Sequence, residues 1–86
     1  MLLALAACAS APVQEMSNAR QAIAAAQQAG AQKVAAKQMA EAQRMMDRAQ
    51  TELDRGNYGS ARQDAVLARS AAEKALRIAQ GNPSPP

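Results

Sequence analysis

The sequence has no histidine, tryptophan or phenylalanine and only one cysteine among its 86 residues. Without histidine or a second cysteine, the chain lacks the usual zinc ligands and cannot form an intramolecular disulfide. The chain offers no pairing of a nucleophile with a general base, so we expect that it is not an enzyme. We also expect it to bind no metal and no cofactor, apart from the covalent lipid discussed below. One tyrosine gives no stacking platform and the four glycines form no phosphate-binding loop, so we expect no nucleic acid partner and no small-molecule substrate.

Alanine and glutamine dominate what is present, at 24 and 10 positions. Both residues suit helices, whereas valine, isoleucine and threonine together fill six positions, too few to build a sheet. The sequence therefore predicts an all-α fold, as an antiparallel helical hairpin or a small three-helix arrangement with alanine-rich heptad seams. The net charge of +3 comes from ten basic and seven acidic residues interspersed along the chain, which is typical of solvated helix surfaces.

Apolar residues at alternating spacings of three and four indicate the buried faces of helices. They predict a helical domain at 14–80, followed by a disordered tail at 81–86. The expected helices lie at about residues 13–29, 32–55 and 58–80. The expected core positions are Met16, Ala19, Ile23, Ala26, Met39, Ala42, Met46, Ala49, Leu53, Tyr58, Ala61, Ala65, Ala68, Ala72, Ala75 and Ala79, with Leu67, Leu76 and Ile78 widening the last face.

The first break is expected at Gly30, because the apolar stripe changes its heptad phase there and glycine suits a helix C-terminus. One long bent helix over 13–55 is the alternative, since an isolated glycine costs a helix only about 1 kcal/mol. The core is thin, because each alanine methyl contributes only about 0.8 kcal/mol when buried. We therefore expect a domain of low stability that gains order from self-association or a partner.

The turn at Gly56, Asn57 and Tyr58 is the clearest local signal. Gly56 can adopt the left-handed conformation that ends a helix, and Asn57 is a good N-cap for the next helix. The chain is therefore expected to reverse here and form a hairpin. We interpret Tyr58 as a packing residue at this turn and not as a recognition site.

The only cysteine follows an apolar N-terminal run, in the stretch Leu5-Ala6-Ala7-Cys8. This stretch resembles the lipobox of bacterial lipoproteins. The resemblance implies cleavage between Ala7 and Cys8, which would remove a signal segment at 1–7 and leave a covalent lipid on Cys8 and a tether at 8–13. The partner would then be a membrane, contacted through the lipid anchor.

Ala9 stands where an aspartate would direct many lipoproteins to the inner membrane, so the resemblance implies the bacterial outer membrane, facing the periplasm. No basic residue precedes the apolar run, which leaves open a true start upstream of Met1. The alternative is that Cys8 is a small buried hydrophobe, and the chain would then be a soluble helical adaptor.

A second resemblance covers the chain from Cys8 to about Ala79. The spacing G-N-Y-x-x-A-R-x-x-A-x-x-A, preceded by M-A-E-A-x-x-x-M-x-x-A-x-x-x-L and by the lipobox, resembles bacterial envelope lipoproteins of the domain-of-unknown-function family numbered 4398. It implies a non-catalytic, lipid-anchored envelope protein with a structural or protein-interaction role. The expected partner is a second copy or another envelope protein.

Arginines recur every seven residues, at Arg48, Arg55, Arg62 and Arg69. Such basic helix faces can contact an anionic membrane surface or cell-wall polymer, which gives an alternative function. The competing interpretation, which we favour, is pairing with acids at helical spacings, which contributes little stability per pair. The expected pairs are Arg48 with Glu52, Arg69 with Glu73, and Glu73 with Arg77.

Overall fold

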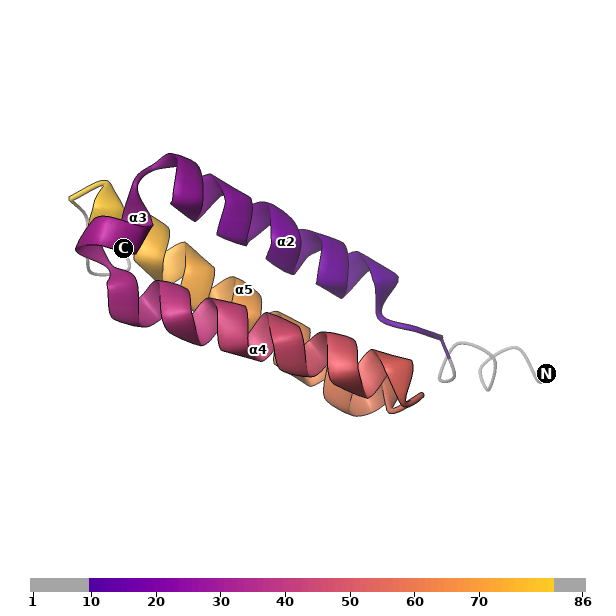
Figure 1. The fold of residues 1–86 in the computed structure, drawn as a ribbon. Coiled ribbons are helices and arrows are strands. Elements are labelled where there is room, and N and C mark those ends of the chain that lie inside the picture. Colours follow the sequence, from indigo (N-terminus) through magenta and orange to yellow (C-terminus); the bar gives the residue numbers. More distant parts are fainter. Residues whose placement is uncertain (1–9, 82–86) are drawn as a thin grey trace.

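The computed structural model describes residues 10–81 (Figure 1). Its elements are the helices α2 (Val13–Gln28), α3 (Ala31–Val34), α4 (Ala36–Asp54) and α5 (Tyr58–Ala79). The predicted all-α class is confirmed for these residues, which contain helices and short connections only. The predicted signal segment at 1–7, Cys8 and residues 82–86 of the predicted tail lie outside the described residues.

The three long helices form an up-down-up bundle (Figure 1). The central helix α5 packs against antiparallel α4 and also along α2, to which it runs parallel, while α2 and α4 touch over a smaller area. Two ends of the bundle can therefore be distinguished. The turn end holds Pro12 and Gly56, and the distal end holds α3 and Gly81 (Figure 1).

The core consists almost entirely of alanine and methionine. Among the described residues, the buried hydrophobic side chains are eleven alanines, four methionines and one isoleucine. Small alanine side chains let the helix axes approach closely, while the flexible methionines fill the irregular space between them. The predicted stripes supply most of this core: Met16, Ala19, Ile23 and Ala26 from α2, Met39, Ala42, Met46 and Ala49 from α4, and Ala61, Ala65, Ala68, Ala72 and Ala75 from α5.

Some edge positions differ from the predicted faces. Leu67 is 48% exposed and does not widen the buried face of α5, because it lies beyond the alanine stripe on the outward side, beside α4. Met45 is buried although the predicted stripe passes through Met46. The reason is that α4 contacts both α2 and α5 and therefore buries a wider arc than one stripe.

The connection between α2 and α4 is a turn followed by one short helix. Gly30 has a left-handed φ of 79°, and its N–H donates to the Gln27 carbonyl at 3.0 Å, which closes α2. The expected second helix at 32–55 is divided, because Ala35 has a φ of −138° and separates α3 from α4. The buried methyl of Ala35 shows that the chain bends here while staying on the core.

Candidate functional site

The turn between α4 and α5 is closed by two backbone hydrogen bonds. Gly56 has a φ of 81°, its N–H donates to the Leu53 carbonyl at 3.0 Å, and the Asn57 N–H donates to the Glu52 carbonyl at 2.8 Å. These are the two bonds of a Schellman motif, which satisfies the last carbonyls of α4. Gly56 therefore has the left-handed role that its sequence context predicts.

Asn57 precedes α5, but the predicted side-chain cap is absent. Its side-chain amide instead donates to Glu52 Oε1 at 2.7 Å, back across the turn. The Schellman geometry places Asn57 beside Glu52, whose ionised carboxylate is a strong acceptor for the side-chain amide N–H. Tyr58 begins α5 and is half-buried at the turn end.

Each of the four regularly spaced arginines is engaged in an ion pair. Two of these pairs join different helices and two lie within or just beyond one helix, so the arginines do not form a single free basic surface. The pairs are Arg48 Nε to Asp64 Oδ2 at 3.8 Å, Arg55 Nη1 to Glu52 Oε2 at 3.7 Å, Arg62 Nε to Glu15 Oε2 at 3.5 Å and Arg69 Nε to Glu73 Oε2 at 3.0 Å.

One of the three predicted ion pairs is confirmed, that of Arg69 with Glu73. The predicted pairing of Arg48 with Glu52 is wrong, because the buried Asp64 of α5 lies within reach of Arg48 and is less well solvated than Glu52. The predicted pair of Glu73 with Arg77 is also absent among the described residues. Nε of Arg77 is buried there without a hydrogen-bond partner.

Arg62 holds the N-terminal segment against α5. Its Nη2 donates to the Ser10 carbonyl at 3.1 Å, and its Nε lies 3.5 Å from the Glu15 carboxylate. Because α2 and α5 are parallel, this contact joins the start of α2 to the first turns of α5. Ser10 follows Cys8 by two positions in the sequence, and the described chain begins at the turn end (Figure 1).

The lysines lie toward the other end of the bundle. The three lysines of the chain, Lys33, Lys37 and Lys74, are exposed and in none of the ion pairs of residues 10–81. Lys33 and Lys37 belong to α3 and the first turn of α4, and Lys74 belongs to the last turns of α5. The antiparallel pairing of α4 with α5 brings these distant sequence positions to the distal end.

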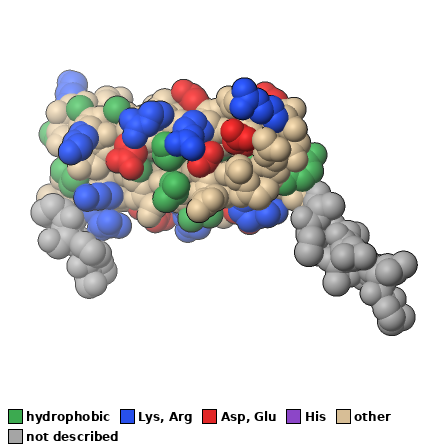
Figure 2. Space-filling model, turned by 90° about the horizontal axis from the view of Figure 1, so that it is seen from below, with side chains coloured by type: hydrophobic (Ala, Val, Ile, Leu, Met, Phe, Trp, Pro, Cys, Tyr) green, Lys and Arg blue, Asp and Glu red, His purple; other side chains and the backbone are tan. Residues whose placement is uncertain are grey.

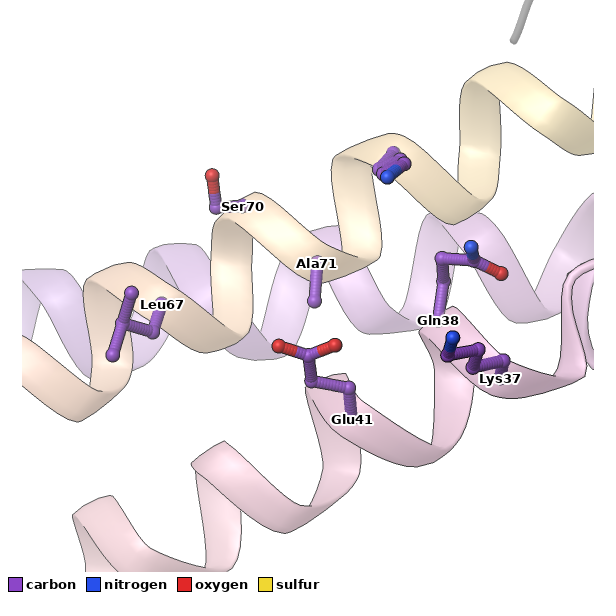
Figure 3. A pocket seen from close by; sticks show the side chains of 7 residues that line it. Lys37, Gln38, Glu41, Leu67, Ser70 and Ala71 are labelled. Carbon is purple, nitrogen blue, oxygen red and sulfur yellow. The ribbon is translucent and has the colours of Figure 1, made fainter.

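A groove of about 390 Å³ runs between α4 and α5 near this end (Figure 3). Its lining comes from both helices and was not predicted, because the exposed faces of two antiparallel helices meet only once their register is known. The lining residues are Lys37, Gln38, Glu41, Leu67, Ser70, Ala71 and Lys74. Figure 3 shows the carboxylate of Glu41 reaching from α4 toward α5 in the middle of the group.

The remaining surface carries mixed charge. On the face that Figure 2 shows, basic and acidic side chains alternate, with apolar side chains scattered between them. Within residues 10–81, no cluster of acidic or thiol side chains is arranged to hold a metal ion. No helix in the same range combines the length and the apolar character needed to cross a membrane.

The up-down-up arrangement, the alanine seams and the closed Gly-Asn-Tyr turn define a small all-α bundle domain. The chain belongs to the family described as Domain of unknown function (DUF4398), whose sequence profile matches residues 14–84. The domain family inferred from the Gly-Asn-Tyr spacing is thereby confirmed, and the match begins after Cys8. No curated protein and no solved structure matches the chain.

Proposed function

We propose that this chain is a non-catalytic, lipid-anchored protein of the bacterial envelope with a structural or protein-interaction role. The absence of histidine and the lipobox-like setting of the only thiol support a role without catalysis. The described helices present solvated faces and a groove, which suit contacts with other macromolecules. The proposed location is the outer membrane on its periplasmic side, supported by Ala9 after Cys8.

The observation that carries the proposal is the relation of Cys8 to the bundle. Ser10 is bonded to Arg62 of α5, and Cys8 stands two positions before it. An acylated Cys8 would thus have a short connection to the turn end, and the bilayer would meet that end of the bundle. Two or more acyl chains on one residue would hold the protein stably without any membrane-spanning helix.

Mass spectrometry of the protein isolated from its host tests the anchor. The expected N-terminus is Cys8 carrying a diacylglyceryl group, and a metabolic palmitate analogue should label the protein. The matched control is Cys8→Ser, which should lose the label and leave the membrane fraction. Recovery of an unmodified Cys8 with residues 1–7 attached would refute the proposal.

The second candidate function is binding to an anionic membrane surface or cell-wall polymer through the basic helix faces. It is favoured by the side chains of Arg48 and Arg55, which stay 63% and 67% exposed although each is paired. Co-sedimentation of the soluble chain with phosphatidylglycerol vesicles or isolated cell wall tests it. Binding that falls steeply with salt and weakens in Arg55→Gln, but not in Arg20→Gln, would support it.

A further inference from the structure

We propose that the groove between α4 and α5 docks an acidic, amphipathic segment of another protein. This deepens the protein-interaction role proposed above by naming a surface and the chemistry of its partner. The groove has a volume of about 390 Å³ and draws its lining from two helices, so the backbone on both sides of it is already helical without a partner (Figure 3).

None of the charged residues that line the groove forms an ion pair within the described chain. Lys37 and Lys74 flank it from opposite helices, and neither forms an ion pair with a residue in the range 10–81. Glu41, whose carboxylate lies between α4 and α5, is likewise in none of those pairs. A partner carboxylate is therefore favoured beside the lysines and disfavoured beside Glu41, which limits the registers in which a segment can bind.

The groove also offers apolar contact surface. Leu67, 48% exposed, and Ala71 come from α5 and line the groove beside the polar side chains of Gln38 and Ser70. A partner that covers Leu67 removes apolar area from water, which gives a contribution that salt does not screen. Val66, next to Leu67 and 53% exposed, lies outside the lining and provides an internal comparison.

The combination of two lysines with an exposed leucine in one groove favours a protein segment over a uniform polyanion as the partner. A polysaccharide or lipid surface would use any exposed lysine and would gain little from Leu67. An amphipathic helix can place an apolar side chain on Leu67 and a carboxylate near Lys37 or Lys74, in the manner of a helix lying in a groove. Lysine ammonium groups on flexible stems suit such a carboxylate without demanding one geometry.

The test uses the purified full chain with three probes. These are a synthetic helical peptide with glutamate and leucine at alternating spacings of three and four, polyglutamate of equal charge, and phosphatidylglycerol vesicles. The amphipathic peptide is expected to bind more tightly than polyglutamate in fluorescence anisotropy. Equal binding of polyglutamate or the vesicles would identify a charged-surface binder and overturn the proposal, as would absence of peptide binding.

Matched variants locate the binding. Lys37→Gln should weaken the peptide complex about two- to fivefold, whereas Lys33→Gln, with the same charge change outside the lining, should leave it nearly unchanged. Equal weakening by both variants would place the interaction outside the groove. All variants alter exposed side chains, so circular dichroism is expected to show an unchanged helical fold.

Two more substitutions distinguish docking in the groove from nonspecific binding. Glu41→Gln should strengthen binding about two- to fivefold, because it removes the one acid of the lining. Leu67→Ser should weaken it severalfold, and Val66→Ser should not. The purified chain needs no lipid for this test, so failure here leaves the anchor intact, while an unmodified Cys8 in the host leaves the groove result intact.

Discussion

Arg62 of α5 donates a hydrogen bond of 3.1 Å to the carbonyl of Ser10, across 52 residues of sequence. The same guanidinium approaches Glu15 in the first turn of α2. One side chain thereby holds the beginning of the described chain and its first helix on the central helix. The position of residues 10–15 on the bundle therefore depends on this contact.

Replacing Arg62 should loosen the start of α2 without unfolding the bundle. Arg62→Gln removes the contacts with Ser10 and Glu15, and since the side chain is partly exposed, the loss is expected to be about 0.5–1 kcal/mol. Hydrogen exchange should accelerate for the first amides of α2. Arg69→Gln is the control, because its partner Glu73 lies in the same helix, and acceleration of α2 in that variant would contradict the assignment.

Asp64 is the only buried charged residue of the described chain, at 6% exposure. Arg48→Gln removes its cation and leaves a carboxylate at the edge of the core, so we expect a loss of about 1–2 kcal/mol in urea unfolding. Adding Asp64→Ala to this variant should restore most of the lost stability, because the second change extends the alanine stripe and improves helix propensity. A double variant less stable than Arg48→Gln alone would contradict this account.

Gly56 and Gly59 should respond oppositely to alanine. Neither glycine has an atom within 4 Å of an added Cβ, so packing does not decide the outcome. Gly56 has a φ of 81°, and Gly56→Ala should cost about 1 kcal/mol through backbone strain alone. Gly59 is helical, and Gly59→Ala should stabilise by about 0.5 kcal/mol. Thermal unfolding of both variants checks the signs, and a stabilised Gly56→Ala would refute the argument.

Replacing a buried alanine of the seam by a larger residue should destabilise the bundle. Ala68 lies fully buried in the middle of α5, and Ala68→Leu would force the helices apart, at an expected cost of about 1–3 kcal/mol. The matched control is Ala40→Leu, on the exposed side of α4, which should stay within about 0.5 kcal/mol of the parent. Urea midpoints measure both. Increased stability of Ala68→Leu would mean that the seam contains unfilled space.

Periodicity was sufficient to predict most of the buried residues. Ala19, Ala42 and Ala68 follow from spacing alone, because a helix repeats its face every three or four residues whatever it packs against. Met45 does not follow, because its burial needs the second neighbour of α4. Leu67 shows the converse, since hydrophobicity alone does not say which side of a helix the partner covers.

Local rules also predicted the turns more reliably than the contacts. Gly30 and Gly56 have positive φ because an abrupt helix end in the left-handed region favours glycine. The partner of Asn57 depended on where Glu52 lies once the turn is closed, and that of Arg48 on the register between α4 and α5. The groove near Lys37 required the same register, so no pattern in the sequence indicated it.

Because the bundle has three long helices, an odd number, the described chain begins at one end of the bundle and finishes at the other. The described chain enters beside Pro12 and leaves at Gly81 after α5, a helix of 22 residues that is about 33 Å long at 1.5 Å per residue. Ser10 and Gly81 thus lie roughly that far apart, so that attachments made at these two residues start from opposite ends of the bundle. A two-helix or four-helix version would return both attachments to one side, and this separation would be lost.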